Sequence, residues 1–300
     1  MIGSSTESAL GADCGSLDRF VDGVHTRARV SGLTHSFYKY PARFSPLFAR
    51  AAIETFTTEG DLVLDPFMGG ATTLVEARVL GRVGVGIDIN SLSCFIARAK
   101  TTHWSDADIR AVQKWTVETA RFINMRTPTK RATSWLELGY QRNINTRQTW
   151  AIRKSLELAL SRIPRLQLSE RQVFARAIVL RTAQWALDCR TDVPSVDQFR
   201  KSLLTFLEEM AEGATEFREA IDSCKVNPGS APPNVAIFNR AVDGVDTDPQ
   251  VRALGVPRLI LTSPPYPGMH VLYHRWQVLG RRETPAPYWI ANSLDGSGLS

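Results

Sequence analysis

The sequence predicts an α/β fold that a long helical insert interrupts, and three observations support this. Between residues 61 and 88, two apolar runs flank a glycine pair and a helical stretch, which is the pattern of a β-α-β unit. Residues 105–225 then have almost entirely helical periodicity. Two more apolar strands follow at residues 235–238 and 258–262, after a break rich in proline and glycine. We therefore expect the sheet to resume where the insert ends.

The β-α-β unit consists of a strand over residues 61–65, a helix over residues 72–80 and a strand over residues 82–87. The pair Gly69-Gly70 supplies the turn between the first strand and the helix. Both strands are nearly continuous apolar runs, which is typical of parallel strands that are covered on both faces.

The helices of the insert are indicated by apolar spacing and by capping boxes. Three helix starts carry such a box: Ser105 with Asp108, Ser169 with Gln172, and Ser195 with Gln198. Because apolar residues recur at helical spacing, we expect Trp115, Trp185 and Phe199 to lie in the core of the insert rather than in a ligand site.

The composition is that of a globular, enzyme-sized chain. Its 300 residues are 43% apolar, and no stretch approaches the roughly 18 to 20 apolar residues of a membrane span. Residues 1–20 are polar and acidic, where a secretory signal would be basic and then apolar. We therefore expect a cytoplasmic protein without membrane contact. Residues 1–30 are rich in Gly, Ser and Asp, which predicts a loose N-terminal arm.

The cysteines are widely scattered, with no CxxC spacing and no histidine pattern beside them: Cys14, Cys94, Cys189 and Cys224. This spacing predicts reduced thiols. We expect no metal site.

Positive charge is concentrated in the insert. Residues 121–181 contain thirteen Lys or Arg against three Glu, a local net charge of +10 compared with +6 for the whole chain. A single arginine in this region is best interpreted as part of a solvated helix face. The excess as a whole favours a polyanionic partner, because self-repulsion has a cost that such a partner offsets.

The turn after the first strand has features of a nucleoside pocket. The run DPFMGGATT, residues 65–73, contains small residues that let the backbone approach a ligand, and its leading acid suits a positive amine or sulfonium. Asp88 ends the second strand 23 residues after Asp65, near the spacing at which an acid binds ribose hydroxyls. A full GxGxxG is missing, so S-adenosylmethionine, which has no phosphate, fits better than a dinucleotide.

The tetrapeptide Ser263-Pro264-Pro265-Tyr266 follows the last apolar strand. Two consecutive prolines remove backbone donors and fix an extended turn that presents carbonyls and an aromatic ring. This suits a flipped nucleobase, because the Ser263 hydroxyl and the Pro264 carbonyl can accept the two amine hydrogens while Tyr266 stacks on the base. The alternatives are a proline-rich loop after a core strand and, for Tyr266, a core aromatic that closes the turn.

Three motifs in this order resemble those of the amino-methylating DNA methyltransferases, which use S-adenosylmethionine to methylate cytosine N4 or adenine N6. The family's first motif, DPFxGxGTT, matches residues 65–73 except at Ala71, and its catalytic motif, (D/N/S)PP(Y/W/F), matches residues 263–266. Residues 35–46, HSFYKYPARFSP, resemble the HxxxxxPAxFxP stretch that helps to hold the cofactor.

The resemblance implies a Rossmann-like methyltransferase sheet and a catalytic role for residues 263–266. It also implies that S-adenosylmethionine is held by residues of the three motifs and the strand ends: Tyr40, Pro41, Phe44, Asp65, Pro66, Phe67, Gly69, Gly70, Thr72, Thr73, Asp88 and Asn239.

Two positions depart from the family pattern. Ala71 adds a methyl group where relatives have glycine, and we expect the fold to absorb it. Relatives place an acid after the third strand to meet the adenine amine. Here either Asn239 serves through its side-chain carbonyl, or Arg240 has displaced that contact.

We therefore expect site-specific methylation of a flipped base in double-stranded DNA. Serine at the head of the catalytic motif favours cytosine N4, with adenine N6 as the alternative because aspartate is the commoner residue there for adenine. An RNA or protein-amide methyltransferase is a rival enzyme, although the basic insert favours nucleic acid. An alternative of another class is a non-catalytic DNA-binding partner that retains the cofactor pocket.

These features divide the chain into four segments. They are an N-terminal arm (1–30), a cofactor-binding half (31–104), a helical insert for DNA target recognition (105–225) and a catalytic half (226–300). The basic and aromatic run over residues 270–282 has two equal interpretations, as phosphate contacts or as an amphipathic helix whose charges are solvated.

Only 34 residues follow Tyr266, which allows a helix over residues 269–279 and one strand near residues 288–290. Relatives complete the sheet with three more strands. We therefore expect a C-terminally incomplete sheet whose last strand, ending at Thr262, lies at an open edge. A C-terminal partner segment, in cis or from another chain, and a companion restriction endonuclease are candidate partners.

Overall fold

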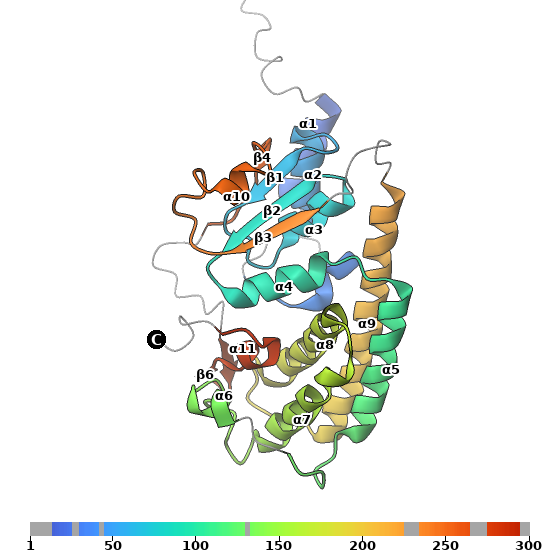
Figure 1. Cartoon of the computed structure of the whole chain (residues 1–300), viewed down its shortest axis with the longest axis vertical. Helices are drawn as coiled ribbons and strands as arrows, with labels where there is room; N and C mark the ends of the chain where they lie inside the picture. Colours follow the sequence, from blue (N-terminus) through green and yellow to red (C-terminus); the bar gives the residue numbers. More distant parts are fainter. Residues whose placement is uncertain are drawn as a thin grey trace, which may run out of the picture.

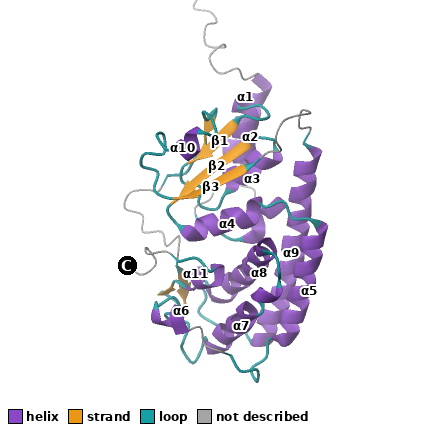
Figure 2. Ribbon diagram, viewed as in Figure 1, coloured by secondary structure: helices purple, strands orange, loops and turns teal. Residues whose placement is uncertain are grey.

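The computed structural model describes residues 14–25, 30–41, 45–129, 133–224, 234–264 and 275–294. Figure 1 shows a sheet with flanking helices in the upper half, a group of helices in the lower half, and α4 (Ser91–Thr101) between them. Figure 2 shows the same division, with the larger sheet confined to the upper part.

The larger sheet has four parallel strands in the order β3-β2-β1-β4. The strands are β1 (Leu62–Asp65), β2 (Val83–Asp88), β3 (Val235–Asn239) and β4 (Leu259–Ile260). β3 follows the insert in sequence and pairs with β2 from Gly84 opposite Val235 to Asp88 opposite Asn239. The predicted α/β fold is confirmed, because the sheet does resume after the helical insert.

Helices α2 (Pro46–Phe56) and α3 (Thr72–Val79) pack on the sheet beside β1 and β4, where Val63 and Leu261 share one apolar cluster with Ile53. Side chains also pack closely against the backbone of β2. A Cβ atom at Gly86 would lie 2.5 Å from the Met68 Sδ, so only glycine fits at that position.

The N-terminal arm was expected to be loose, and this is wrong for residues 14–25. They form helix α1 (Cys14–His25), which packs on α2. The Phe20 ring lies 5.8 Å from the Phe48 ring and 5.3 Å from the Phe56 ring, centroid to centroid. Leu17, Phe20 and Val24 recur at helical spacing in this segment, and burying part of this apolar face against α2 stabilises the helix.

The insert is helical, as predicted. Its elements are α5 (Asp106–Phe122), α6 (Thr133–Glu137), α7 (Trp150–Ser161), the 3₁₀ turn η2 (Ile163–Arg165), α8 (Ser169–Leu187) and α9 (Val196–Ser223). The side chains of Trp115 and Phe199 are buried in its core, and Trp185 packs against that core.

Two of the three predicted capping boxes are present, at Ser105 and at Ser195. The third prediction is wrong, because Ser169 is the first residue of α8 and Leu168 precedes it as the cap. The Gln172 side chain donates instead to the Leu166 carbonyl, at 2.7 Å.

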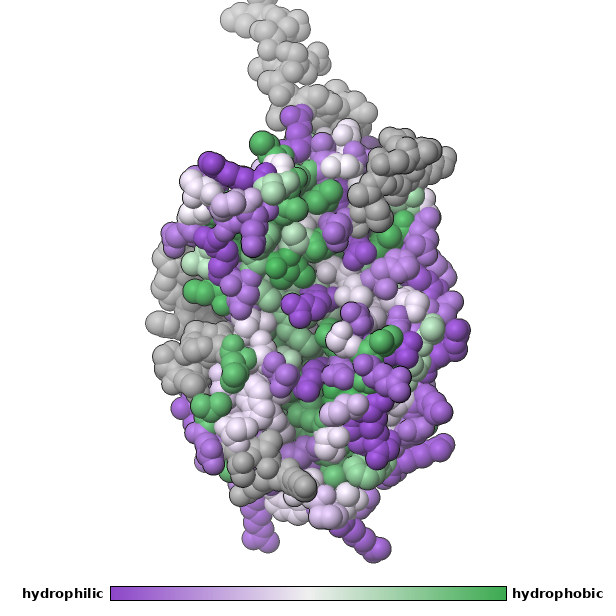
Figure 3. Space-filling view, in the orientation of Figure 1, coloured by the Kyte–Doolittle hydropathy of each residue, from purple (hydrophilic) through white to green (hydrophobic). Residues whose placement is uncertain are grey.

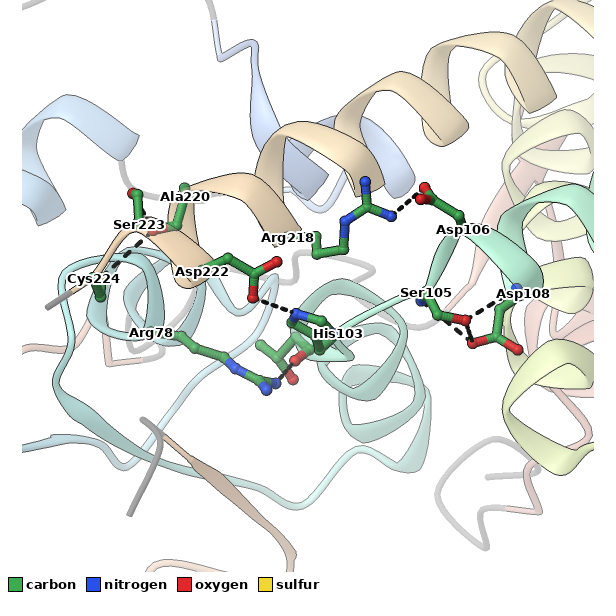
Figure 4. A network of polar contacts seen from close by, with 11 residues as sticks. Arg78, His103, Ser105, Asp106, Asp108, Arg218, Ala220, Asp222, Ser223 and Cys224 are labelled. Carbon is green, nitrogen blue, oxygen red and sulfur yellow. Dashed lines mark hydrogen bonds and ion pairs between the residues drawn. The ribbon is translucent and has the colours of Figure 1, made fainter. Parts of the chain in front are cut away.

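Polar contacts join the end of α9 to the segment where the insert begins (Figure 4). The His103 Nε2 lies 2.8 Å from the Asp222 Oδ1, and Arg218 pairs with Asp106. α9 therefore returns the chain to the place where the insert began.

The C-terminal part differs from its prediction. A helix was expected over residues 269–279, but residues 276–278 form strand β5 (Trp276–Val278), which pairs antiparallel with β6 (Arg282–Thr284). A strand was expected over residues 288–290, but they belong to helix α11 (Ala286–Ala291). Residues 265–274 lie outside the described part of the chain.

This hairpin packs against the helical part and does not extend the larger sheet. The Trp276 Nε1 donates to the Tyr38 hydroxyl at 2.9 Å, and the Cys189 N–H donates to the Gln277 carbonyl at 2.8 Å. Trp276 and Val278 are buried with Gln277 half-buried between them, which is the two-residue period of a strand.

Candidate functional site at the carboxyl edge of the sheet

The parallel sheet brings four predicted site residues to one edge. Asp65 ends β1, Asp88 ends β2 and Asn239 ends β3, while Ser263 comes three residues after the end of β4. Because all four strands run in the same direction, their carboxyl ends lie at the same side of the sheet. In open α/β sheets this is the side where ligands bind.

The Asp88 carboxylate is held by backbone donors on both of its oxygens. The Gly69 N–H donates to Oδ2 at 2.9 Å, and the Asn90 N–H donates to Oδ1 at 2.8 Å. These contacts fix the orientation of the carboxylate and tie the glycine turn to the end of β2.

The Asp65 carboxyl group is buried, and burial raises its pKa to about 6. The nearby hydroxyl groups of Thr73 and Thr262, and the Phe67 N–H that donates to the Asp65 Oδ1 at 3.2 Å, act in the opposite direction, because they stabilise the charged form. An acid with a raised pKa at a strand end indicates a candidate functional position, since a buried carboxylate gains most from a cationic ligand.

The side chains of Tyr40 and Lys100 contact the glycine turn. A Cβ atom at Gly69, where φ is +43°, would lie 3.0 Å from the Tyr40 ring, and the Tyr40 hydroxyl is 2.9 Å from the Ser93 Oγ. The buried Lys100 ammonium donates to the Gly70 carbonyl at 2.8 Å. Tyr40 and Lys100 thus hold the backbone of the turn in place.

Ala71 has a left-handed backbone, with φ 61° and ψ 27°, directly before α3. Its side chain is fully buried in an apolar cluster with Met68 and Leu74. The fold therefore absorbs the extra methyl group into the core, at a backbone cost that glycine would not have.

Asn239 is exposed at the end of β3. Its amide nitrogen donates to the carbonyls of Asp88 and Ile89, both at 3.0 Å, so the amide oxygen points away from these carbonyls. Arg240 pairs with Asp248 and donates to the Asp243 carbonyl. Of the two interpretations for this strand end, the geometry favours Asn239 as the group that accepts from a ligand.

The remaining predicted residues lie on the same turn and strand ends, except for the residues before α2. Ser263, Pro66 and Phe67 are half-buried, Thr72, Thr73 and Gly70 are buried, and Pro41 and Pro264 are exposed. Phe44, Pro265 and Tyr266 lie outside the described residues, so the structure describes only Ser263 and Pro264 of the tetrapeptide that was predicted to be catalytic.

Sequence reasoning missed Asn90 and Tyr288. The Asn90 Oδ1 accepts from the Leu92 N–H and from the Tyr288 hydroxyl, both at 2.9 Å. The first contact caps α4, and an asparagine just before a helical run could have indicated it. The second joins residues 198 positions apart, which no local pattern predicts.

Over the described ranges, no helix is long and apolar enough to span a bilayer. The same residues contain no group of three or more His, Cys, Asp or Glu side chains that could hold a metal ion.

The parallel sheet with an acid at the end of each of its first two strands and a glycine turn between them defines a Rossmann-like methyltransferase fold. Residues 19–98 match the family model described as DNA methylase, which covers N6 and N4 methyltransferases. This segment is therefore similar to the amino-methylating DNA methyltransferases, which agrees with the two motifs that lie within it.

Curated relatives align over the same kind of short segment. The type II methyltransferase M.MjaII of Methanocaldococcus jannaschii is 34% identical over 80 residues, which is 27% of this chain and 14% of the relative. M.MvaI of Kocuria varians is 42% identical over 73 residues, or 23% of this chain and 16% of the relative. The orphan methyltransferase M.BamHII of Bacillus amyloliquefaciens is 34% identical over 67 residues, or 22% and 25%.

The matched part of the chain thus spans a small fraction of these relatives. No solved structure matches the chain significantly.

Proposed function

We propose that this chain transfers a methyl group from S-adenosylmethionine to the exocyclic N4 of a flipped cytosine in double-stranded DNA. The observation that carries this proposal is the gathering of Asp65, Asp88, Asn239 and Ser263 at one edge of the sheet. The matched family segment supplies the first two of these residues and the turn between them.

The residues at this edge fit the proposed cofactor. The fixed Asp88 carboxylate can accept the ribose hydroxyls, and the outward amide oxygen of Asn239 can accept the adenine amine. The Thr72 hydroxyl, in the first turn of α3, is buried with no hydrogen-bond partner among the described residues. It lies at a helix N-terminus, where the carboxylate of the methionine moiety would be stabilised.

The catalytic motif would act by holding the amine. The Ser263 hydroxyl and the Pro264 carbonyl would accept its two hydrogens, so that the nitrogen lone pair turns out of the base plane. When bound, the cofactor supplies an electrophilic methyl group on a sulfonium sulfur. The acceptors stabilise the positive charge that develops on the amine, and the methylated amine then releases one of its two protons to solvent, so no strong base is needed.

Adenine N6 is the second candidate target, because the adenine methyltransferases of the family use the same motif. A chain that binds DNA and cofactor without turnover is the candidate of another class. The intact Asp65, Asp88 and Ser263 favour an enzyme.

The test is methyl transfer from labelled S-adenosylmethionine to mixed-sequence duplex DNA, followed by digestion to nucleosides and chromatography. We expect label in N4-methylcytosine. Label in N6-methyladenine would reverse the choice of target. Cofactor and DNA binding without any labelled nucleoside would favour the non-catalytic alternative.

We further propose that another segment, in cis or from a partner, covers the sheet beside β4. Ile260 in β4 is 61% exposed and Val256 just before it is 90% exposed. Figure 3 shows hydrophobic residues gathered over the sheet on the face that is turned towards the viewer. Steady turnover by a monomer of this chain alone would contradict this proposal. A companion restriction endonuclease is a candidate partner on the family resemblance alone.

A further inference from the structure

Four exposed arginines lie on two segments that pack against each other. Arg142 and Arg147 belong to the loop before α7, and Arg281 and Arg282 belong to the turn and second strand of the β5-β6 hairpin. The Asn143 side chain donates to the Glu283 carbonyl at 2.7 Å, which fixes the loop beside the hairpin. We call Arg142, Arg147, Arg281 and Arg282 the basic rim.

Most of the other described arginines between residues 121 and 181 make contacts within the protein. Arg153 pairs with Glu157, Arg162 contacts Glu118, and Arg171 pairs with Asp108 at 2.8 Å. Arg176 donates to the Ile290 carbonyl, and the buried Arg181 lies over the Phe206 ring. The net charge of +10 counted from the sequence therefore overstates the positive charge that is available to bind a polyanion.

Within the described part of the chain, none of the four rim guanidinium groups has a hydrogen-bond or ion-pair partner. Few acidic side chains lie near the rim, and most of them already contact another group. Glu283 pairs with Arg275 at 3.2 Å, Asp192 pairs with Arg190, and the Asp188 carboxylate accepts the Gln277 N–H. Glu137, the last residue of α6, is an exposed acid just before the loop that carries Arg142 and Arg147. The rim thus presents a net positive surface.

The rim is also attached to the candidate site. α11 follows the hairpin directly, and the Tyr288 hydroxyl on α11 donates to the Asn90 Oδ1 at 2.9 Å. The Asn90 N–H in turn donates to the Asp88 carboxylate. The Tyr140 ring of the loop lies 5.9 Å from the Tyr288 ring, edge to face, so the loop and the hairpin share this anchor.

We infer that the basic rim binds the phosphate backbone of duplex DNA on the side of the molecule where the carboxyl edge of the sheet lies. This rests on the proposed function, which it deepens by naming the DNA-binding surface. The four arginines contact phosphates and orient the duplex towards Ser263, and they read no bases. Of the two interpretations for residues 270–282, phosphate contact is therefore the one we adopt for Arg281 and Arg282.

The test compares two variants with equal loss of charge. In the rim variant Arg142, Arg147, Arg281 and Arg282 are changed to Gln. In the control variant the exposed cations of α5 and the loop after it are changed to Gln: Arg110, Lys114, Arg121 and Arg126. α5 lies on the opposite side of the helical part from α6 and α11 (Figure 1). All eight side chains are exposed, so both variants should keep the unfolding midpoint and the cofactor affinity of the parent.

The measurement is the affinity for a mixed-sequence duplex by fluorescence anisotropy at several salt concentrations between 50 and 200 mM. Each phosphate contact contributes about 0.9 to the slope of log K against log salt, so the rim variant should lose up to about 3.6 units of slope. Between 50 and 200 mM salt, the DNA affinity of the rim variant should therefore fall by a factor about 150-fold smaller than that of the parent. The control variant should keep the parent slope.

An unchanged slope in the rim variant, an equal loss in both variants, or no DNA binding by the parent would each overturn the inference. Methyl transfer is measured in parallel to separate this inference from the proposed function. A parent that transfers methyl groups but shows no rim effect leaves the function standing and the rim refuted. A rim effect without any methyl transfer leaves the rim standing and the function refuted.

Discussion

Replacing Asp65 by Asn should make the protein more stable near neutral pH while weakening the proposed cofactor site. Burial raises the pKa of this carboxyl from 3.8 to about 6. Between these two values the native state holds a proton that the unfolded state has lost, so stability falls as the pH rises through this window. A difference of about two pKa units corresponds to a penalty of about 3 kcal/mol, which is fully present at pH 7 and absent below pH 3.8.

The assay is urea unfolding at intervals from pH 4 to pH 7.5. The Asp65→Asn variant should match the parent near pH 4 and exceed it by up to about 3 kcal/mol at pH 7, because the amide has no charge to bury. Exposed Asp246, changed to Asn, serves as the control and should leave the profile unchanged. Parent and Asp65→Asn curves that stay parallel across the whole range would refute the reasoning. Calorimetry should show weaker S-adenosylmethionine binding, the cost in function that accompanies this gain.

Three further substitutions test other parts of the site. Ser263→Ala should lower the methylation rate roughly ten- to a hundredfold, or about 1.5 to 3 kcal/mol of barrier, with cofactor affinity unchanged, and retained full turnover would remove the assigned role. Asp88→Ala should weaken cofactor binding roughly ten- to a hundredfold in calorimetry and leave DNA affinity intact, because the proposed ribose acceptor is lost; an unaltered dissociation constant would contradict this. Tyr288→Phe should lower the free energy of unfolding by about 1 kcal/mol through loss of the hydrogen bond to Asn90, and identical urea midpoints would show that this contact contributes nothing.

Much of the sheet half could be predicted because its signals are local. The strands over residues 61–65 and 82–87 are apolar runs that end in an acid, and the structure places β1 and β2 there within one residue at each end. The capping boxes at Ser105 and Ser195 are also local. Ser169 failed because the cap and the first helical residue differ by one position, which a sequence pattern does not resolve.

The C-terminal errors have a tertiary cause. Tyr288, Trp289 and Ile290 favour a strand by intrinsic preference, yet they are buried in a short helix that starts just after Pro285. The hairpin before it turns at Gly280, with φ +93°. Alternating burial is present only in the three residues of β5, and β6 does not alternate. Packing against the helical part decides both elements, and that packing has no local signature.

The residues of the candidate site also fall into those with a local sequence signal and those without one. Asp65 and Asp88 could be predicted because each ends a strand, and Ser263 because it begins a recognisable motif after β4. Asn90, Lys100 and Tyr288 could not, since what matters is their contact with a partner far along the chain.

The pairing of β2 with β3 has a consequence for how the protein is made. The Asn239 side chain meets the Asp88 carbonyl across 151 residues, so β2 leaves the ribosome long before its neighbour exists. During that interval one edge of β2 has unpaired backbone groups, which is the condition in which nascent sheets pair wrongly. The insert accounts for most of this interval, but its helices form from local contacts and α9 brings the chain back to His103 and Asp106, beside the waiting sheet. On this view the helical part also affects how the sheet forms during translation. Slow translation within residues 105–225 would harm correct pairing of the sheet more than slow translation after residue 239.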